Sequence, residues 1–169
     1  AGIVPEMVKE VGTVYDVPEE NGFDSAESLL EEPRLSDAIF ITTQDQQHVK
    51  QAVKAMEKGY DILMEKPISP DLSECREIVR RSRELGRKVV VCHVLRYTPL
   101  YQKVKKILDQ KKSGEVVSVM GIENVGYWHQ AHSFVRGNWR NSDETSPMIL
   151  QKCCHDLDLL LWLTGKTCR

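Results

Sequence analysis

A lysine stands where a buried strand is expected to end, in the tripeptide Glu65-Lys66-Pro67. Ligands bind beside the carboxyl ends of strands in open α/β sheets. An ammonium group at such a place can donate hydrogen bonds to a ligand oxygen. Lys66 is therefore the first candidate catalytic residue. The alternative is a surface lysine at a turn, because Pro67 cannot continue a central strand.

His155 is the second candidate, one helical turn after Gln151 and three residues before Asp158. An imidazole changes its protonation state near neutral pH, which suits it to take or give a proton during a reaction. The alternative is a histidine that is hydrogen-bonded at a helix packing face, since most buried polar groups are simply satisfied there.

Polar residues also follow the two other predicted strands: Thr43, Asp45 and His48 after the first, and Arg96 after the third. These positions suit ligand contacts at the same edge of the sheet. Asp45 could instead cap the next helix, with His48 in its first turn. Arg96 could equally be a surface arginine.

The segment Arg136-Gly137-Asn138-Trp139-Arg140 has the composition of a pocket loop. Arginine and tryptophan suit sugar or carboxylate recognition through forked hydrogen bonds and an apolar face. A packed tryptophan between solvated arginines is the alternative. We expect no metal site at Cys153-Cys154-His155-Asp156, because adjacent helical cysteines diverge by about 100° and zinc sites prefer spaced ligands.

Three apolar β-rich runs, at residues 38–42, 60–64 and 88–94, predict buried strands. Between them, helices are predicted from about His48 to Gly59 and, with capping-box spacing at Asp71 and Glu74, up to Gly86. Alternation of strand and helix with short connections predicts a parallel sheet. An earlier helix is predicted from Asp24, capped toward Glu27, to just before Pro33.

The pattern changes after residue 95, where we place a boundary between domains 1–95 and 96–169. The remaining predicted elements are a helix from Tyr101 to about Ser113, a long strand over residues 115–127, a loop over 134–146 and a helix over 148–163 that ends at Gly165. The long strand suits an open, partly solvated sheet.

Composition excludes several classes of protein. The chain has 169 residues, 41% hydrophobic and 28% charged, with a net charge of −2, which fits a folded domain and gives no sign of a nucleic-acid partner. No apolar run is long enough to cross a bilayer, and the five cysteines show no regular spacing. We therefore expect no membrane partner and a cytoplasmic location with reduced thiols.

The motifs together resemble the Gfo/Idh/MocA oxidoreductases. The resemblance rests on their order along the chain: Ser36-Asp37-Ala38-Ile39-Phe40-Ile41-Thr42-Thr43, His48, Glu65-Lys66-Pro67, Arg96-Tyr97-Thr98-Pro99 and His155-Asp156-Leu157-Asp158. It implies an α/β fold, with an incomplete Rossmann-type parallel sheet followed by the start of an α/β domain whose open sheet is mainly antiparallel. The sequence contains no G-x-G-x-x-G, so the resemblance implies an internal fragment that lacks the Gly-rich phosphate turn and much of the second domain.

The resemblance also implies roles. Lys66 and His155 would be catalytic. The residues expected to bind NAD or NADP are Thr43, Asp45, His48, Glu65, Lys66, Pro67 and Arg96, and those expected to bind substrate are Lys66, Trp139, Arg140, Lys152 and His155. The reaction implied is hydride transfer to or from a hydroxyl-bearing carbon of a sugar or polyol. The complete protein is expected to be a homo-oligomer, a dimer or a tetramer.

The sequence departs from the family pattern at two positions. Gln44 stands in place of a proline, and Gln151 stands where many members have an aspartate, and glutamine cannot stabilise an imidazolium as a carboxylate does. Two other functions therefore stay open. One is a glycosidase of the same fold that uses bound NAD for transient oxidation. The other is a truncated, non-catalytic binding module.

Overall fold

A three-stranded parallel sheet forms the centre of the computed structural model, which describes residues 1–167. The strands are β1 (Ala38–Ile41), β2 (Asp61–Met64) and β3 (Val89–Val91), in the order β1-β2-β3. Both pairs are parallel, with Ala38 opposite Asp61 and Ile62 opposite Val89. The predicted Rossmann-type α/β unit is confirmed, although β3 is shorter than the predicted strand 88–94.

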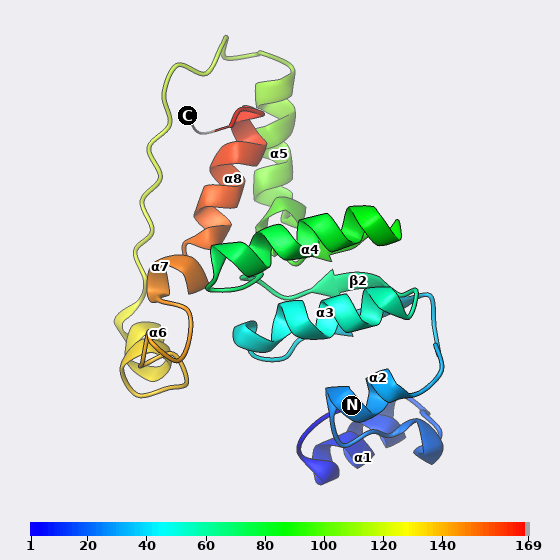
Figure 1. The fold of residues 1–169 in the computed structure, drawn as a ribbon. Helices are drawn as coiled ribbons and strands as arrows, with labels where there is room; N and C mark the ends of the chain where they lie inside the picture. The colour runs from blue at the N-terminus through cyan, green and yellow to red at the C-terminus, as the bar shows by residue number, and fades with distance from the viewer. Residues whose placement is uncertain (168–169) are drawn as a thin grey trace.

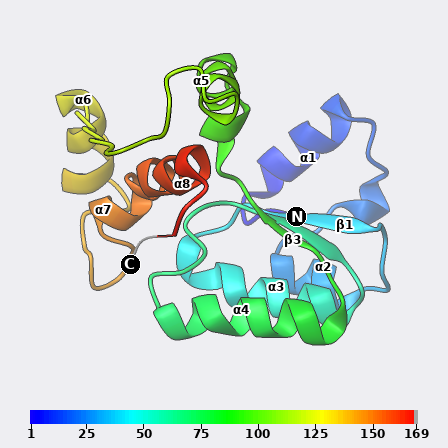
Figure 2. The same cartoon turned by 90° about the horizontal axis from the view of Figure 1, so that it is seen from above.

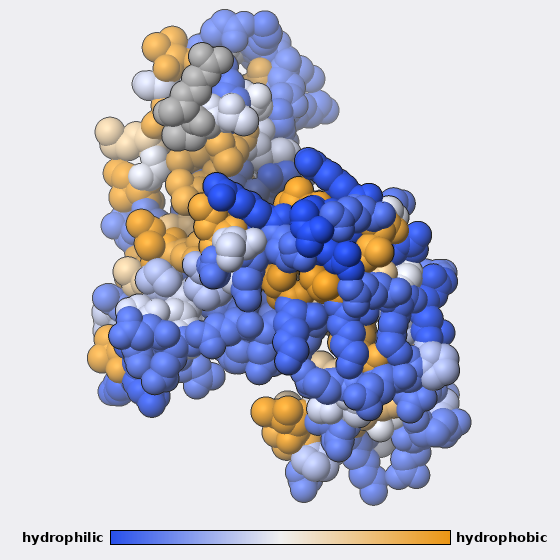
Figure 3. All heavy atoms as spheres, viewed as in Figure 1, coloured by the Kyte–Doolittle hydropathy of each residue, from blue (hydrophilic) through white to orange (hydrophobic). Residues whose placement is uncertain are grey.

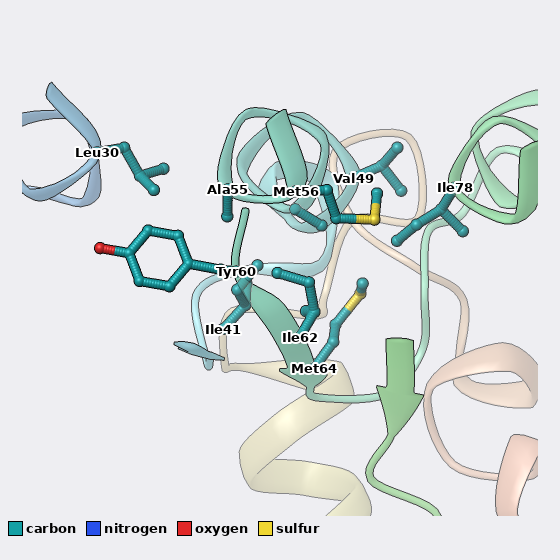
Figure 4. Close-up of a cluster of buried hydrophobic side chains, with 10 residues drawn as sticks. Leu30, Ile41, Val49, Ala55, Met56, Tyr60, Ile62, Met64 and Ile78 are labelled. Carbon is teal, nitrogen blue, oxygen red and sulfur yellow. The ribbon is translucent and has the colours of Figure 1, made fainter. Parts of the chain in front are cut away.

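Two helices cover one face of this sheet, α3 (His48–Glu57) and α4 (Leu72–Leu85), as Figure 2 shows. The apolar stripe of α3 meets β1 and β2, and α4 packs against α3. Figure 4 shows the resulting core, in which Met56, Met64 and Ile78 converge between the helices and the sheet. The core members are Leu30, Ile41, Val49, Ala52, Ala55, Met56, Tyr60, Ile62, Met64 and Ile78.

The helix ends follow their cap residues, with two corrections. Asp71 caps α4 by accepting from Ser73 N at 2.6 Å, and Gly86 ends it with φ 62°, as predicted. The Glu74 carboxylate does not close the capping box, because it accepts from the Ser69 hydroxyl instead.

The helix before β1, α2 (Ala26–Glu31), ends before Pro33 as predicted. Its capping box, however, is formed by Ser25 and Ser28 and not by the predicted pair Asp24 and Glu27. The Asp24 carboxylate accepts from the two serine hydroxyls, at 3.2 and 2.8 Å, and so supports the box from outside. The helix begins at Ala26, so Ser25 occupies the N-cap position and Asp24 lies one residue before it.

The N-terminal residues form α1 (Pro5–Val14) and a 3-10 turn, η1 (Glu19–Asn21), neither of which the sequence patterns indicated. No residue of α1 is buried. Figure 1 shows α1 at the opposite end of the molecule from α5 and α8.

The chain after β3 passes through a 3-10 turn, η3 (Val94–Tyr97), into α5 (Pro99–Asp109). The predicted strand over residues 115–127 is wrong. Residues 115–126 are extended but pair with no strand in the described chain, and run alone from α5 to α6 (Figure 1). A strand needs a neighbour for its N–H and C=O groups, and residues 1–167 supply none here, so no antiparallel sheet forms.

The segment 115–126 leaves apolar side chains in solvent: Val117 is 96% exposed, and Met120 and Ile122 are also exposed. Figure 3 shows hydrophobic residues gathered on this side of the molecule, over the segment and α8.

The C-terminal part has four short helical elements: α6 (Tyr127–Gln130), the π-helical turn η4 (Ala131–Val135), α7 (Met148–Gln151) and α8 (Cys154–Thr164). The single helix predicted over 148–163 is broken at Lys152 and Cys153, and η4 replaces the start of the predicted loop 134–146. Gly165 ends α8 with φ 64°, as predicted. Within residues 1–167, every helix is too short or too polar to cross a membrane.

Candidate active site at the carboxyl edge of the sheet

A cavity of about 340 Å³ lies at the carboxyl ends of β1 and β2. One wall comes from the residues that follow these strands, and the other from the segment between α6 and the end of α7. Its lining residues are Thr42, Thr43, Gln44, Asp45, His48, Glu65, Lys66, His129, Ser133, Phe134, Trp139, Gln151 and Lys152. The fold therefore brings together two parts of the chain that lie far apart in the sequence.

Seven of the predicted site residues line this cavity, namely Thr43, Asp45, His48, Glu65, Lys66, Trp139 and Lys152. The other four, Pro67, Arg96, Arg140 and His155, lie outside the lining. Pro67 is the turn residue after β2, and its peptide bond with Lys66 is cis. Arg140 is exposed on the loop that carries Trp139.

The amine of Lys66 is held by Gln151. Lys66 Nζ donates to the backbone oxygen of Gln151 and to its side-chain Oε1, both at 2.7 Å. An ammonium group has three N–H donors. Two of them are used in these contacts, so one remains for a ligand oxygen in the cavity.

The carboxylate of Asp45 is buried, at 3% exposure, and does not cap a helix. Its Oδ2 accepts from Ser146 N at 3.2 Å and from Gln151 Nε2 at 3.3 Å, and its Oδ1 accepts from Gln46 N at 3.1 Å. Both carboxylate oxygens of Asp45 thus accept hydrogen bonds from the protein itself, and these bonds support the cavity wall.

His48 ties the two strand ends together. Its Nδ1 lies 2.9 Å from the carbonyl oxygen of Pro67, and its Nε2 lies 3.0 Å from that of Thr43. The Thr43 hydroxyl in turn donates to Gln51 Oε1 at 2.7 Å. These contacts fix the loop after β1 against the turn that carries Lys66.

His155 lies four residues after Gln151, at the start of α8. Its ring packs edge-on against that of His93, with ring centroids 5.9 Å apart. Burial, together with the nearby Lys66 ammonium, lowers the pKa of His155. Burial also lowers the pKa of His93, against the opposing effect of Asp158. The neutral imidazole is thereby favoured, and a neutral imidazole can accept a proton. The Nδ1 atoms of both rings are buried without a partner in the described chain.

Arg96 pairs with Asp158 of α8, with Nε 2.6 Å from Oδ2 and Nη2 2.5 Å from Oδ1. This contact places Arg96 at the junction of η3 and α8.

Sequence reasoning missed several residues at the site. His93 follows β3 by two positions, but it was hidden inside the overlong predicted strand 88–94. His129, Ser133 and Phe134 line the cavity from α6 and η4, and the aromatic cluster Tyr127-Trp128-His129 was the available signal. Ser146, fully buried beside Asp45, carried no sequence signal.

A parallel strand–helix–strand unit with a polar cavity at the carboxyl edge of its sheet is typical of the nucleotide-binding proteins of the Rossmann class. Comparison with known families narrows this class. The model of the oxidoreductase family with an NAD-binding Rossmann fold matches residues 2–93, and that of the Gfo/Idh/MocA C-terminal domain matches residues 101–169. The chain belongs to the Gfo/Idh/MocA family, and the predicted link to NAD is confirmed at the level of that family.

Individual relatives agree with this family. Inositol 2-dehydrogenase of Corynebacterium glutamicum is 26% identical over 164 residues, which are 96% of this chain and 45% of that protein. The chain thus spans less than half the length of this curated relative.

Solved structures share the fold. The scyllo-inositol dehydrogenase of Lactobacillus casei with bound NAD(H) and scyllo-inositol has a TM-score of 0.78 at 23% identity, over 98% of this chain and 47% of that one. The WlbA dehydrogenase of Bordetella pertussis in complex with NADH and UDP-GlcNAcA has a TM-score of 0.75 at 22% identity, over 96% and 45%.

Proposed function

We propose that this chain forms the nicotinamide-facing half of an NAD(P)-dependent dehydrogenase that acts on a hydroxyl-bearing carbon of a sugar, polyol or related compound. The observation that carries the proposal is the Lys66 amine, which lies in a polar cavity at the carboxyl end of β2 with one donor left for a ligand. The named substrates of the inositol dehydrogenases support the class of substrate.

The cavity residues fit the nicotinamide end of such a cofactor. Thr43, His48 and Glu65 form a polar wall beside Lys66 at the ends of β1 and β2. Bound NAD(P) would accept the hydride from the substrate carbon. No G-x-G-x-x-G is present in the sequence, so these residues account for one end of the cofactor only.

The chain's own residues would position the substrate and move its proton. Lys66 donates its remaining N–H to the substrate hydroxyl and fixes the oxygen. His155 lies outside the cavity lining, at the start of α8. In this proposal the substrate extends from Lys66 toward α8, and the neutral imidazole of His155 takes the hydroxyl proton as the substrate carbon gives up its hydride and the carbonyl forms. The lowered pKa of His155 keeps the ring unprotonated before this step. Trp139 and Lys152, on the opposite wall, would contact the rest of the substrate.

We also propose that residues 1–95 belong to the cofactor domain and residues 96–169 to the start of the substrate domain, whose antiparallel sheet would include residues 115–126. The change from parallel α/β structure to isolated helices after β3 supports this division. A dimer or tetramer of the complete protein is part of the same proposal.

The test compares the complete protein with its Lys66→Met variant over a panel of sugars and polyols, with NAD and with NADP. Loss of the positioned amine is expected to lower kcat/KM on the order of 10²–10⁴-fold, while the exposed Lys50→Met control keeps its rate. Unchanged turnover in Lys66→Met excludes the catalytic role. Sugar release without net formation of reduced cofactor would instead support the glycosidase.

A further inference from the structure

We infer that Asp45 is the positioning residue for Lys66 and acts on it through the side-chain amide of Gln151. The inference deepens the proposed function, because it assigns the group that holds the ligand-facing amine. It rests on a continuous chain of contacts, from the Asp45 carboxylate to Gln151 Nε2 and from Gln151 Oε1 to Lys66 Nζ.

The contacts of Gln151 fix which way its amide points. The amide nitrogen is a donor and the amide oxygen an acceptor. Asp45 offers only acceptors, so the nitrogen must face Asp45, and the oxygen then faces the Lys66 ammonium, which offers only donors. A flipped amide would set donor against donor and acceptor against acceptor. Gln151 is only 6% exposed, so its amide cannot satisfy these groups by hydrogen bonding to water instead.

The same arrangement links two opposite charges through a neutral amide. The contacts of the Asp45 carboxylate in the described chain are neutral donors: two backbone N–H groups and the Gln151 amide. A buried carboxylate needs a compensating positive charge. The ammonium of Lys66 lies one amide group away, with the amide dipole aligned between the two charges. Gln151 therefore acts as a neutral spacer that links an acid to the amine without touching it directly.

Asp45 also anchors the wall that carries Gln151. Ser146 N donates to Asp45, and the neighbouring Gln46 side chain donates to Glu144 O. Both contacts join the segment before α7 to the loop after β1. Loss of the Asp45 charge would thus free Gln151 in two ways, through its amide and through its backbone segment.

The experiment measures how freely the Lys66 amine reacts in the 169-residue chain. The protein is labelled briefly with an acetylating reagent at one pH, and Lys66 and the exposed Lys50 are compared by peptide mass spectrometry. Asp45→Asn keeps the shape and removes the charge, and is expected to raise the Lys66 to Lys50 ratio about threefold or more. The double variant Asp45→Asn with Gln151→Glu moves the carboxylate next to the amine. It is expected to return the ratio to the original value or lower.

Ser146→Ala is the matched control. It changes a buried residue at the same contact but keeps the backbone N–H that binds Asp45, and the hydroxyl that it removes has no partner in residues 1–167. Its ratio is expected to equal that of the unmodified chain. A Ser146→Ala ratio raised as far as that of Asp45→Asn overturns the inference, because general loosening would then explain the effect.

An unchanged ratio in Asp45→Asn, or a double variant as reactive as Asp45→Asn, also overturns it. Should Asp45→Asn fail to fold by circular dichroism, the double variant decides: a folded protein with a protected Lys66 supports the inference, and an unfolded one overturns it. The labelling needs neither cofactor nor sugar, so its result is separate from that of the Lys66→Met assay.

Discussion

The guanidinium of Arg96 donates two hydrogen bonds, of 2.6 and 2.5 Å, to the carboxylate of Asp158. This pair connects the turn after β3 to α8. The Asp158 side chain is 11% exposed. The same guanidinium lies 5.9 Å from the ring centroid of Trp162, one turn further along α8. This junction orients the helix that begins next to His155.

Asp158→Asn is expected to lower the free energy of unfolding by about 1 kcal/mol, because it removes the charge from a forked pair whose carboxylate is mostly buried and whose guanidinium is partly exposed. Urea unfolding measures the change. Glu84→Gln is the comparison, since Glu84 pairs with Arg80 on an exposed face of α4. Exposed pairs contribute little, so this variant should unfold almost as the unmodified chain does. Equal losses in the two variants would contradict the structural role of the Arg96–Asp158 pair.

The core under α4 gives a second prediction. Ile78 is 2% exposed and its neighbour Val79 is 46% exposed. Ile78→Ala leaves a cavity against Met56 and Met64 and should cost about 2–5 kcal/mol of unfolding free energy. Val79→Ala, on the same helix, should change it by less than about 1 kcal/mol. Similar values for both variants would mean that α4 packs through a different face.

Gly86 gives a third prediction. It ends α4 in the left-handed region, and a Cβ there would meet no atom within 4 Å. Gly86→Ala therefore tests backbone strain alone, and should cost roughly 1–2 kcal/mol of unfolding free energy. Gly126→Ala is the control, because Gly126 has φ −57° and equally open surroundings. That change should be neutral or slightly stabilising. A harmless Gly86→Ala would refute the left-handed cap.

The two half-buried histidines His93 and His155 predict a pH dependence of stability. The pKa values of His93 and His155 are both lowered in the fold, so the unfolded chain binds protons more readily than the folded chain. Their stabilisation is complete above the ordinary pKa of 6.5 and is lost as the pH falls through the lower folded values. Urea midpoints should therefore drop between about pH 7.5 and about pH 5.5.

Replacing both histidines should remove most of that drop. The variant His93→Gln with His155→Gln is expected to show a flatter profile than the unmodified chain. His132→Gln serves as the control, because His132 is exposed on η4, and it should leave the profile unchanged. A profile that stays equally steep in the double variant would show that other groups cause the drop.

The parallel unit could be predicted because its signals are local. Strand, helix and strand follow one another from Ala38 to Val91, and each apolar run or capping residue acts within a few positions. Lys66 could be proposed for the same reason, since it directly follows a strand. The bend between α7 and α8 could not, because residues 148–163 have a continuous helical pattern and the break at Lys152 depends on tertiary contacts.

The contact partners at the site were beyond sequence reasoning as well. The sequence marks Gln151 as a departure from the family pattern but does not indicate that it is the acceptor for Lys66. Asp45 was expected to face the cofactor or to cap a helix, yet its partners Ser146 and Gln151 lie 101 and 106 positions away. No periodicity can indicate pairs at such separations. The prediction of a strand over 115–127 is wrong for the opposite reason. The local pattern favours a strand, but residues 1–167 supply no neighbouring strand to pair with it.

The separations at the cavity have a consequence for how the chain folds. The sheet and its two helices form through connections between neighbours in the sequence, whereas the contacts of Lys66 and Asp45 with residues 146–151 each close a loop of at least 85 residues. The entropy of closing such loops must be offset before these contacts stabilise anything. We therefore expect the second wall to dock onto a sheet that is already assembled, with the segment between α5 and α6 as part of the loop that this docking closes.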